Sequence, residues 1–218
     1  MNYLKKIQLF LFLIVVLFIS SCATVYYPTT LNTPLFQEQG EKFVDVSLNG
    51  GSFIFSGGYA MREHFALAGQ LSAYSVSGQI GQTVTGGEGV QFDITPGYFT
   101  SFGENGVFET YTGYGLGRIT ADDFDGTLHK FYIQPNIGYR GDNFHGAFSV
   151  RMMNVLFDAR NPFFELGNAQ YIEPAVSLKF GGERFMFTSQ FGGSFPINSN
   201  FEYEHFPFIV SIGCAYRF

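Results

Sequence analysis

The feature that most constrains this fold is a two-residue alternation of apolar and polar side chains from Glu41 to the last residue, Phe218. A period of two places alternate side chains on opposite faces of a β-strand. The last eleven residues are typical, since one parity reads Phe208, Val210, Ile212, Cys214, Tyr216 and Phe218. No stretch of this region keeps a 3.6-residue period for three turns, so we expect strands and no helix.

The composition favours a membrane over water as the solvent for these strands. The chain has 28 Phe, 13 Tyr and 27 Gly but no Trp, and only 14% of its residues are charged. A soluble β-sandwich also alternates, but it must bury nearly all of its aromatic side chains. A transmembrane barrel exposes them to lipid. The sequence therefore predicts an all-β, closed antiparallel transmembrane β-barrel.

Gly, Asn and Asp clusters divide residues 41–218 into ten strands. The expected strands lie near 42–49, 52–61, 65–76, 88–102, 106–120, 127–140, 145–158, 170–181, 184–197 and 204–218. Tight turns alternate with longer polar connections, as periplasmic turns and extracellular loops do in outer-membrane barrels. We expect the longer connections at 77–87, 121–127, 159–169 and 198–203.

Two points in this division stay open at the level of the sequence. An eight-stranded barrel is the alternative if residues 42–61 form one bent strand around Asn49-Gly50-Gly51. The alternation also lapses near Met152-Met153, where we expect a β-bulge or the membrane boundary.

The N-terminus reads as a secretory leader. A basic start with Lys5 and Lys6 precedes an apolar run over 7–19, which is short for a transmembrane helix. The junction Ile19-Ser20-Ser21-Cys22 resembles the lipobox of bacterial lipoproteins. That resemblance implies cleavage of a signal peptide, residues 1–21, and acylation of Cys22, with palmitate among the acyl groups. The aperiodic, proline-containing residues 22–40 would then form a lipid-anchored periplasmic tether before the barrel at 41–218.

Two short motifs resemble those of small Gram-negative outer-membrane barrels of the OmpA and OmpX kind. "GYAMREHFAL" at 58–67 is similar to a strand–turn–strand step of that family, and "AYRF" at 215–218 is similar to its C-terminal β-signal. The resemblance implies that the barrel-assembly machinery reads Tyr216 and Phe218. It also implies integral insertion in the outer membrane. With Phe218 in the periplasm, an even number of ten strands returns the N-terminus to the periplasmic side, so we expect the lipid anchor there.

The charge restricts the partners. Residues 1–21 carry two of the 12 basic side chains and no acidic one, so the mature chain has 10 basic and 18 acidic side chains, a net charge of 10 − 18 = −8. No basic face exists for nucleic acid. Cys214 has no disulfide partner once Cys22 is acylated. The expected partners are the lipid bilayer, the assembly machinery and another envelope protein.

Charged residues recur on the polar parity of the strands, which a barrel turns inward. A barrel of eight to ten strands has an interior that side chains nearly fill, and charges buried there must pair. We therefore expect an ion-pair network that plugs the lumen, with a narrow small-solute pore as the alternative. The network residues are Asp93, Glu109, Arg140, Arg151, Glu173 and Lys179.

No constellation of residues points to catalysis. His129 and His205 are expected near the outer rim, where a lipid-modifying hydrolase would act, but no nucleophile has a recognisable local motif. "ADDFDGTLHKFY" at 121–132 departs from a calcium loop at both required acidic ends. The glycines of "GYGLG" at 113–117 are expected to leave room inside the barrel. We expect no enzymatic activity, metal or cofactor, and rank a structural or partner-binding barrel above a pore and a lipid-modifying enzyme.

Overall fold

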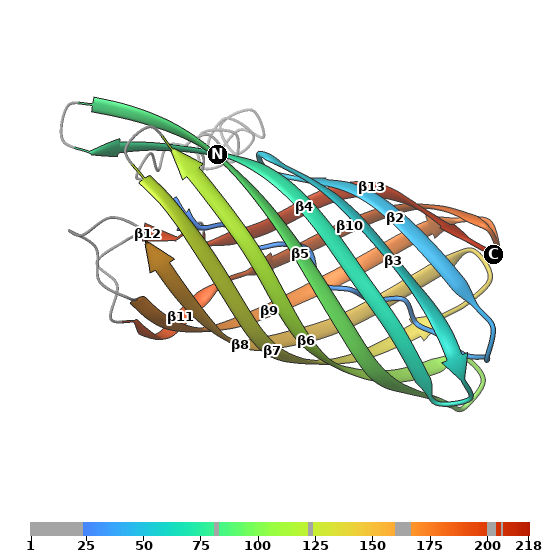
Figure 1. Cartoon of the computed structure of the whole chain (residues 1–218). Helices are drawn as coiled ribbons and strands as arrows, with labels where there is room; N and C mark the ends of the chain where they lie inside the picture. Colours follow the sequence, from blue (N-terminus) through green and yellow to red (C-terminus); the bar gives the residue numbers. More distant parts are fainter. Residues whose placement is uncertain (1–23, 81–82, 122–123, 160–166, 200–203, 206) are drawn as a thin grey trace, which may run out of the picture.

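The computed structural model describes residues 24–80, 83–121, 124–159, 167–199, 204–205 and 207–218. Ten antiparallel strand positions close into a barrel, as expected, and the described residues contain no helix (Figure 1). The wall strands are β2 (Lys42–Asn49), β3 (Ser52–Arg62), β4 (Phe65–Ile80), β5 (Thr83–Phe102), β6 (Gly106–Ala121), β7 (Phe124–Arg140), β8 (Phe144–Ala159), β9 (Gly167–Gly181), β10 (Phe185–Gly193) with β11 (Phe195–Ser199), and β13 (Phe208–Arg217). The eight-strand alternative is wrong because β2 and β3 form a separate hairpin.

The barrel closes through its C-terminal strand. β13 pairs with β10, placing Phe185 opposite Tyr216, and with β2, placing Phe43 opposite Arg217. β10 also pairs with β9, so the wall closes on itself along the length of β10. Among the described residues, β11 pairs with β9 alone. Two short segments, β1 (Thr24–Tyr26) and β12 (Glu204–His205), form a separate parallel pair.

The two ends of the barrel differ. The tight turns 63–64, 103–105, 141–143 and 182–184 lie at one end, which we call the turn end, together with the start of β2 and the C-terminus. At the other, which we call the hairpin end, β4 and β5 continue to Ile80 and Thr83, and β6 and β7 to Ala121 and Phe124. The loops expected at 77–87 and 121–127 are therefore mostly strand.

The physical reason for this difference lies in the solvent around the hairpin end. The β4–β5 ladder continues through the pair Val76–Gly87 to Ile80–Thr83. An apolar face is needed only where a strand contacts lipid, so a hairpin beyond the bilayer loses the alternation that marks its strands in the sequence. The loops expected at 159–169 and 198–203 lie partly outside the described residues.

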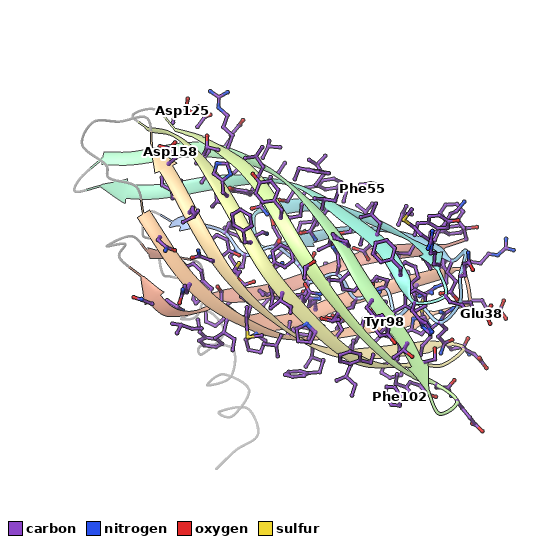
Figure 2. The ribbon with its side chains drawn as sticks, turned by 60° about the horizontal axis from the view of Figure 1, so that its bottom comes forward. Glu38, Phe55, Tyr98, Phe102, Asp125 and Asp158 are labelled. Carbon is purple, nitrogen blue, oxygen red and sulfur yellow. The ribbon has the colours of Figure 1, made fainter. Side chains whose placement is uncertain are left out.

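The outward face of the wall is apolar. Large hydrophobic side chains such as Phe55, Phe92, Phe131 and Ile212 are exposed there, with Ile212 at 66%. An apolar surface of this extent is unfavourable in water and is the lipid-facing band of a transmembrane barrel. Figure 2 shows Tyr98 and Phe102 toward the turn end and the charged Asp125 and Asp158 at the hairpin end. Among the described residues, no helix is long and apolar enough to cross a membrane.

The chain between β1 and β2 runs through the lumen, where the blue trace passes inside the barrel in Figure 1. Residues from Tyr26 to Phe36 are buried apart from the partly buried Tyr27. The expectation of a periplasmic tether over 22–40 is therefore wrong for this stretch. The stretch is rich in Thr and Asn and has an irregular backbone, which suggests a solvated linker. The same features also fit a polar lumen, where wall side chains can hydrogen-bond to them.

The expected bulge at Met152-Met153 is also absent from the β8–β9 ladder, which continues in register from Arg151–Glu173 to Met153–Tyr171. The alternation lapses for another reason: Met153, Val155 and Phe157 point inward and pack in one cluster with Tyr26. Apolar residues on the inward parity thus mark the place where the lumen contains an apolar partner.

Candidate functional site

The candidate site is the lumen, where the wall surrounds residues 26–36, hereafter the lumenal segment. Eight consecutive backbone carbonyls of this part of the chain, from Pro28 to Leu35, accept hydrogen bonds from wall side chains. The donors, in that order, are Asn49, Arg151, Gln70, Gln190, Gln134 together with Asn136, Lys179, Arg217 and Arg140. A backbone without a sheet partner must find donors elsewhere when it is buried, and here side chains from seven strands supply them.

Arg151 of β8 and Glu173 of β9 form an ion pair next to the start of the segment, with Arg151 Nε 2.7 Å from Glu173 Oε2. Arg151 also donates to the carbonyl of Thr29 at 2.8 Å, and the Tyr26 hydroxyl donates to Glu173 Oε1 at 3.0 Å. Both charged side chains are at most 1% exposed. Two residues of the expected network therefore lie within ion-pair distance, and the lumenal segment supplies their remaining hydrogen-bond partners.

Asp93 of β5 pairs with Lys130 of β7 rather than with another residue of the expected network. Lys130 Nζ lies 2.9 Å from Asp93 Oδ2, and both side chains are inaccessible to solvent. Gln91 donates to the other carboxylate oxygen at 2.9 Å. The ring of Tyr132 lies between this pair and Arg151, with Lys130 and Arg151 5.2 and 5.4 Å from its centroid. The two ion pairs are thus connected through an aromatic ring.

Glu109 of β6 is fully buried and is satisfied by neutral donors. It accepts from the backbone N–H of Phe36 at 2.9 Å, the Tyr111 hydroxyl at 3.1 Å and the Asn136 amide at 3.3 Å. Asn136 in turn donates to the carbonyl of Asn32. A buried carboxylate needs several donors, and one of the three comes from the lumenal segment.

The last two expected network residues bind the far part of the segment. Lys179 donates to the carbonyl of Thr33 at 2.6 Å. Arg140 donates to the carbonyl of Leu35 at 3.1 Å and pairs with Glu41 at 2.7 Å. Arg217 also pairs with Glu41, at 3.0 Å. These contacts lie near the turn end, where the segment leaves the lumen and β2 begins.

Two apolar clusters close the polar part of the lumen at either end. Toward the hairpin end, Tyr26 stacks on Tyr171, with ring centroids 4.9 Å apart, inside a cluster that includes Tyr132 and Phe157. Toward the turn end, Phe36 packs on Phe43 and Phe99 at 5.8 and 5.7 Å. Each end of the segment therefore carries an aromatic anchor.

The glycines of 113–117 make room for this network, as the sequence predicts. A Cβ added to Gly113 would lie 2.1 Å from the Tyr132 ring. One added to Gly115 would lie 2.1 Å from Asp93 Oδ1. Because these glycines have no side chains, large polar residues of the neighbouring strands can lie across β6.

The other predicted residues lie elsewhere. Tyr216 and Phe218 are exposed on the lipid face at the turn end, with rings 4.9 Å apart. His129 is hydrogen-bonded to Tyr114, with its Nδ1 2.8 Å from the hydroxyl. Cys22 and the side chain of His205 lie outside the described residues. Among the residues the structure describes, no three His, Cys, Asp or Glu side chains gather as a metal site would require.

Sequence reasoning missed Lys130, Glu41 and Arg217 as network members, and it missed the lumenal segment itself. Ion-pair partners on different strands depend on register and on diagonal neighbours, which periodicity does not determine. One signal for the segment was present: Leu31, Leu35 and Phe36 are large apolar residues in a stretch interpreted as a solvated tether, and all three are buried.

No protein-family model matches the sequence, and no curated protein matches it. Two solved structures are similar in part. The translocator domain of the autotransporter NalP from Neisseria meningitidis has a TM-score of 0.41 at 12% identity, with 82% of this chain and 87% of that chain covered. The KdgM porin in complex with disordered oligogalacturonate has a TM-score of 0.35 at 13% identity, with 82% and 99% covered.

Proposed function

We propose that this chain is a lipid-anchored outer-membrane β-barrel with a structural or partner-binding role, whose lumen is plugged by its own N-terminal segment. The run of eight consecutive carbonyls of the segment, each bound by a wall side chain, carries the proposal. A pore would need these donors to face water or solute. Here they are used internally.

Two further features support a permanent plug. Among the described residues, the cavity that lies in the lumen beside Thr30 and Lys179 measures about 30 Å³, which is room for about one water molecule. Leu35 adopts a φ of 54°, which is uncommon for a residue with a side chain and persists only where the surroundings hold it. A loosely inserted segment would relax to an ordinary conformation.

The test is planar-bilayer conductance of the purified protein, comparing the wild type, Glu173→Ala and a deletion of residues 26–36. A plugged barrel gives no steady current in the wild type. Glu173→Ala is expected to flicker, because Arg151 and Tyr26 lose the carboxylate that holds them. The deletion is expected to open a steady current if the barrel folds, which its heat-modifiable migration on a gel reports.

A narrow pore is the second candidate, and the polar lining of the lumen favours it. Gln70, Gln134, Gln190 and Lys179 would line a water-filled channel if the segment were released. Steady, ion-selective openings of the wild type would overturn the plug and establish the pore. Silence in every variant, together with a mass shift of lipid A upon overexpression, would instead point to the lipid-modifying enzyme.

A further inference from the structure

The lumenal segment has a direction, and this direction determines where the N-terminus emerges. Along β9, Tyr171 contacts Tyr26, Glu173 accepts from the Tyr26 hydroxyl, and Lys179 donates to the carbonyl of Thr33. Arg151 donates both to Glu173 and to the carbonyl of Thr29. β9 runs from the hairpin end to the turn end, so the segment runs the same way. Glu38, just beyond the segment, lies at the turn end in Figure 2.

Contacts on other strands give the same order. On β7, which also runs toward the turn end, Gln134 binds Asn32 and Arg140 binds Leu35. At the hairpin end, the β2–β3 turn binds the start of the segment, since Asn49 donates to the carbonyl of Pro28 and the Gly51 N–H to the Tyr27 hydroxyl. Three wall strands and the β2–β3 turn therefore agree that the chain enters the lumen at the hairpin end.

We propose that the mature N-terminus emerges at the hairpin end, on the cell-exterior side, so that the acyl group on Cys22 inserts in the outer leaflet. This rests on the proposed acylation of Cys22. It reverses the anchor side expected from the sequence, because the chain passes through the barrel before β2 begins rather than approaching β2 from the periplasm.

Chain length excludes a periplasmic anchor. Tyr26 lies four positions after Cys22, and four extended residue steps span at most about 14 Å. From Tyr171, against which Tyr26 stacks, β9 continues ten residues to Gly181 at the turn end. Ten strand residues rise about 33 Å, or about 25 Å along the axis of a barrel whose strands tilt by about 40°. The reach of about 14 Å is thus about 11 Å too short for Cys22 to leave the barrel at the turn end.

The hairpin end has the character of the exterior side. Its outward residues include the exposed Glu88 and Asp158 and the exposed pair Arg118–Asp125. The turn end has tight turns, both ends of the barrel domain, and a girdle of exposed aromatic side chains. In outer-membrane barrels the short turns face the periplasm and the longer extensions face outward. The chain between Cys22 and β2 thus crosses the membrane through the polar lumen.

The experiment labels introduced cysteines on intact cells with a membrane-impermeant maleimide, in a Cys214→Ser background whose only other cysteine is Cys22. The Cys214→Ser protein without an added cysteine is the control, since any label on it reports a Cys22 thiol that is not acylated. Thr24→Cys reports the N-terminus, Asp158→Cys the hairpin end and Asn143→Cys the turn end. Labelling of Thr24→Cys and Asp158→Cys on intact cells, and of Asn143→Cys only after lysis, is the expected result. Labelling of Thr24→Cys only after lysis, or of Asn143→Cys on intact cells, would overturn the inference.

Mass spectrometry of the N-terminal peptide separates this inference from the proposed acylation. A diacyl or triacyl mass on Cys22 together with a surface-labelled Thr24→Cys supports an outer-leaflet anchor. A peptide without acyl mass overturns the lipid anchor itself, whatever the labelling shows. Thr24→Cys changes a single side chain, so we expect the barrel to fold. Heat-modifiable migration on a gel checks that the labelled molecules are folded.

Discussion

Glu109 of the wall accepts a hydrogen bond from the backbone N–H of Phe36 at 2.9 Å, at a position where neither residue is exposed to solvent. Within the described part of the chain, Glu109 has hydrogen-bond donors but no salt-bridge partner. The N–H group of the lumenal segment therefore supplies one of the hydrogen bonds that offset the desolvation of the Glu109 carboxylate. The segment in turn depends on the wall, because its backbone has no sheet partner and its carbonyls accept hydrogen bonds from wall side chains. Barrel and segment therefore form one folding unit.

Removing the carboxylate of Glu173 tests the stability of this unit. Glu173→Ala leaves Arg151 buried without its counter-charge and is expected to lower the free energy of unfolding by about 3–5 kcal/mol. Glu88→Ala, at an exposed site of β5, is the matched control and should change it by no more than about 0.5 kcal/mol. Urea titration followed by heat-modifiable migration measures both. Equal midpoints for the two variants would contradict a structural role for the pair.

The Asp93–Lys130 pair predicts non-additive stability. Asp93→Leu or Lys130→Met alone leaves one buried charge unpaired and is expected to cost about 3–5 kcal/mol, whereas the double variant removes both charges and should recover most of that loss. A double-mutant cycle of unfolding free energies measures the coupling. The exposed pair Arg118–Asp125 is the control and should show little coupling. Additive effects at Asp93 and Lys130 would mean that the 2.9 Å contact contributes nothing.

The wall was predictable from the sequence because the bilayer imposes its own pattern on each strand. Expected strands such as 106–120 and 52–61 agree with Gly106–Ala121 and Ser52–Arg62 to within a residue. The prediction failed where that pattern ends. The β4–β5 ladder continues to the pair Ile80–Thr83, where the sequence no longer alternates, and these last residues were interpreted as a loop.

The lumen was predictable in kind but not in detail. Inward charges follow from parity, so Arg151 and Glu173 could be identified, but Lys130 as the partner of Asp93 depends on contacts between non-adjacent strands. The lumenal segment had no periodic pattern, because its backbone binds side chains from seven strands instead of one ladder. Only its buried apolar residues, such as Leu35 and Phe36, distinguished it from a linker.

Assembly is expected to depend on the C-terminal aromatic residues. Changing both Tyr216 and Phe218 to Ser should leave unfolded chain in the periplasm, because β13 closes the wall against β10 and β2 and carries the residues that resemble an assembly signal. Phe102→Ser is the control, since Phe102 is also an exposed aromatic residue at the turn end but lies on β5. The heat-modifiable fraction in isolated membranes measures assembly. Normal folding of the double variant would refute the signal.

The packing of Tyr132 against Gly113 gives the last prediction. A Cβ at position 113 would lie 2.1 Å from the Tyr132 ring, which is buried between Lys130 and Arg151 and has little room to withdraw. Gly113→Ala is therefore expected to destabilise the barrel by about 1–3 kcal/mol. Gly182→Ala, where the added Cβ meets no atom within 4 Å, should have little effect.

Truncating the ring distinguishes this steric cause from a general intolerance of alanine on β6. Adding Tyr132→Leu to Gly113→Ala removes the clash, so the double variant should be less destabilised than the sum of the two single variants. Unfolding midpoints in urea for the four proteins give the comparison. Additive losses would show that the glycine acts through its backbone rather than through the space it leaves for the Tyr132 ring.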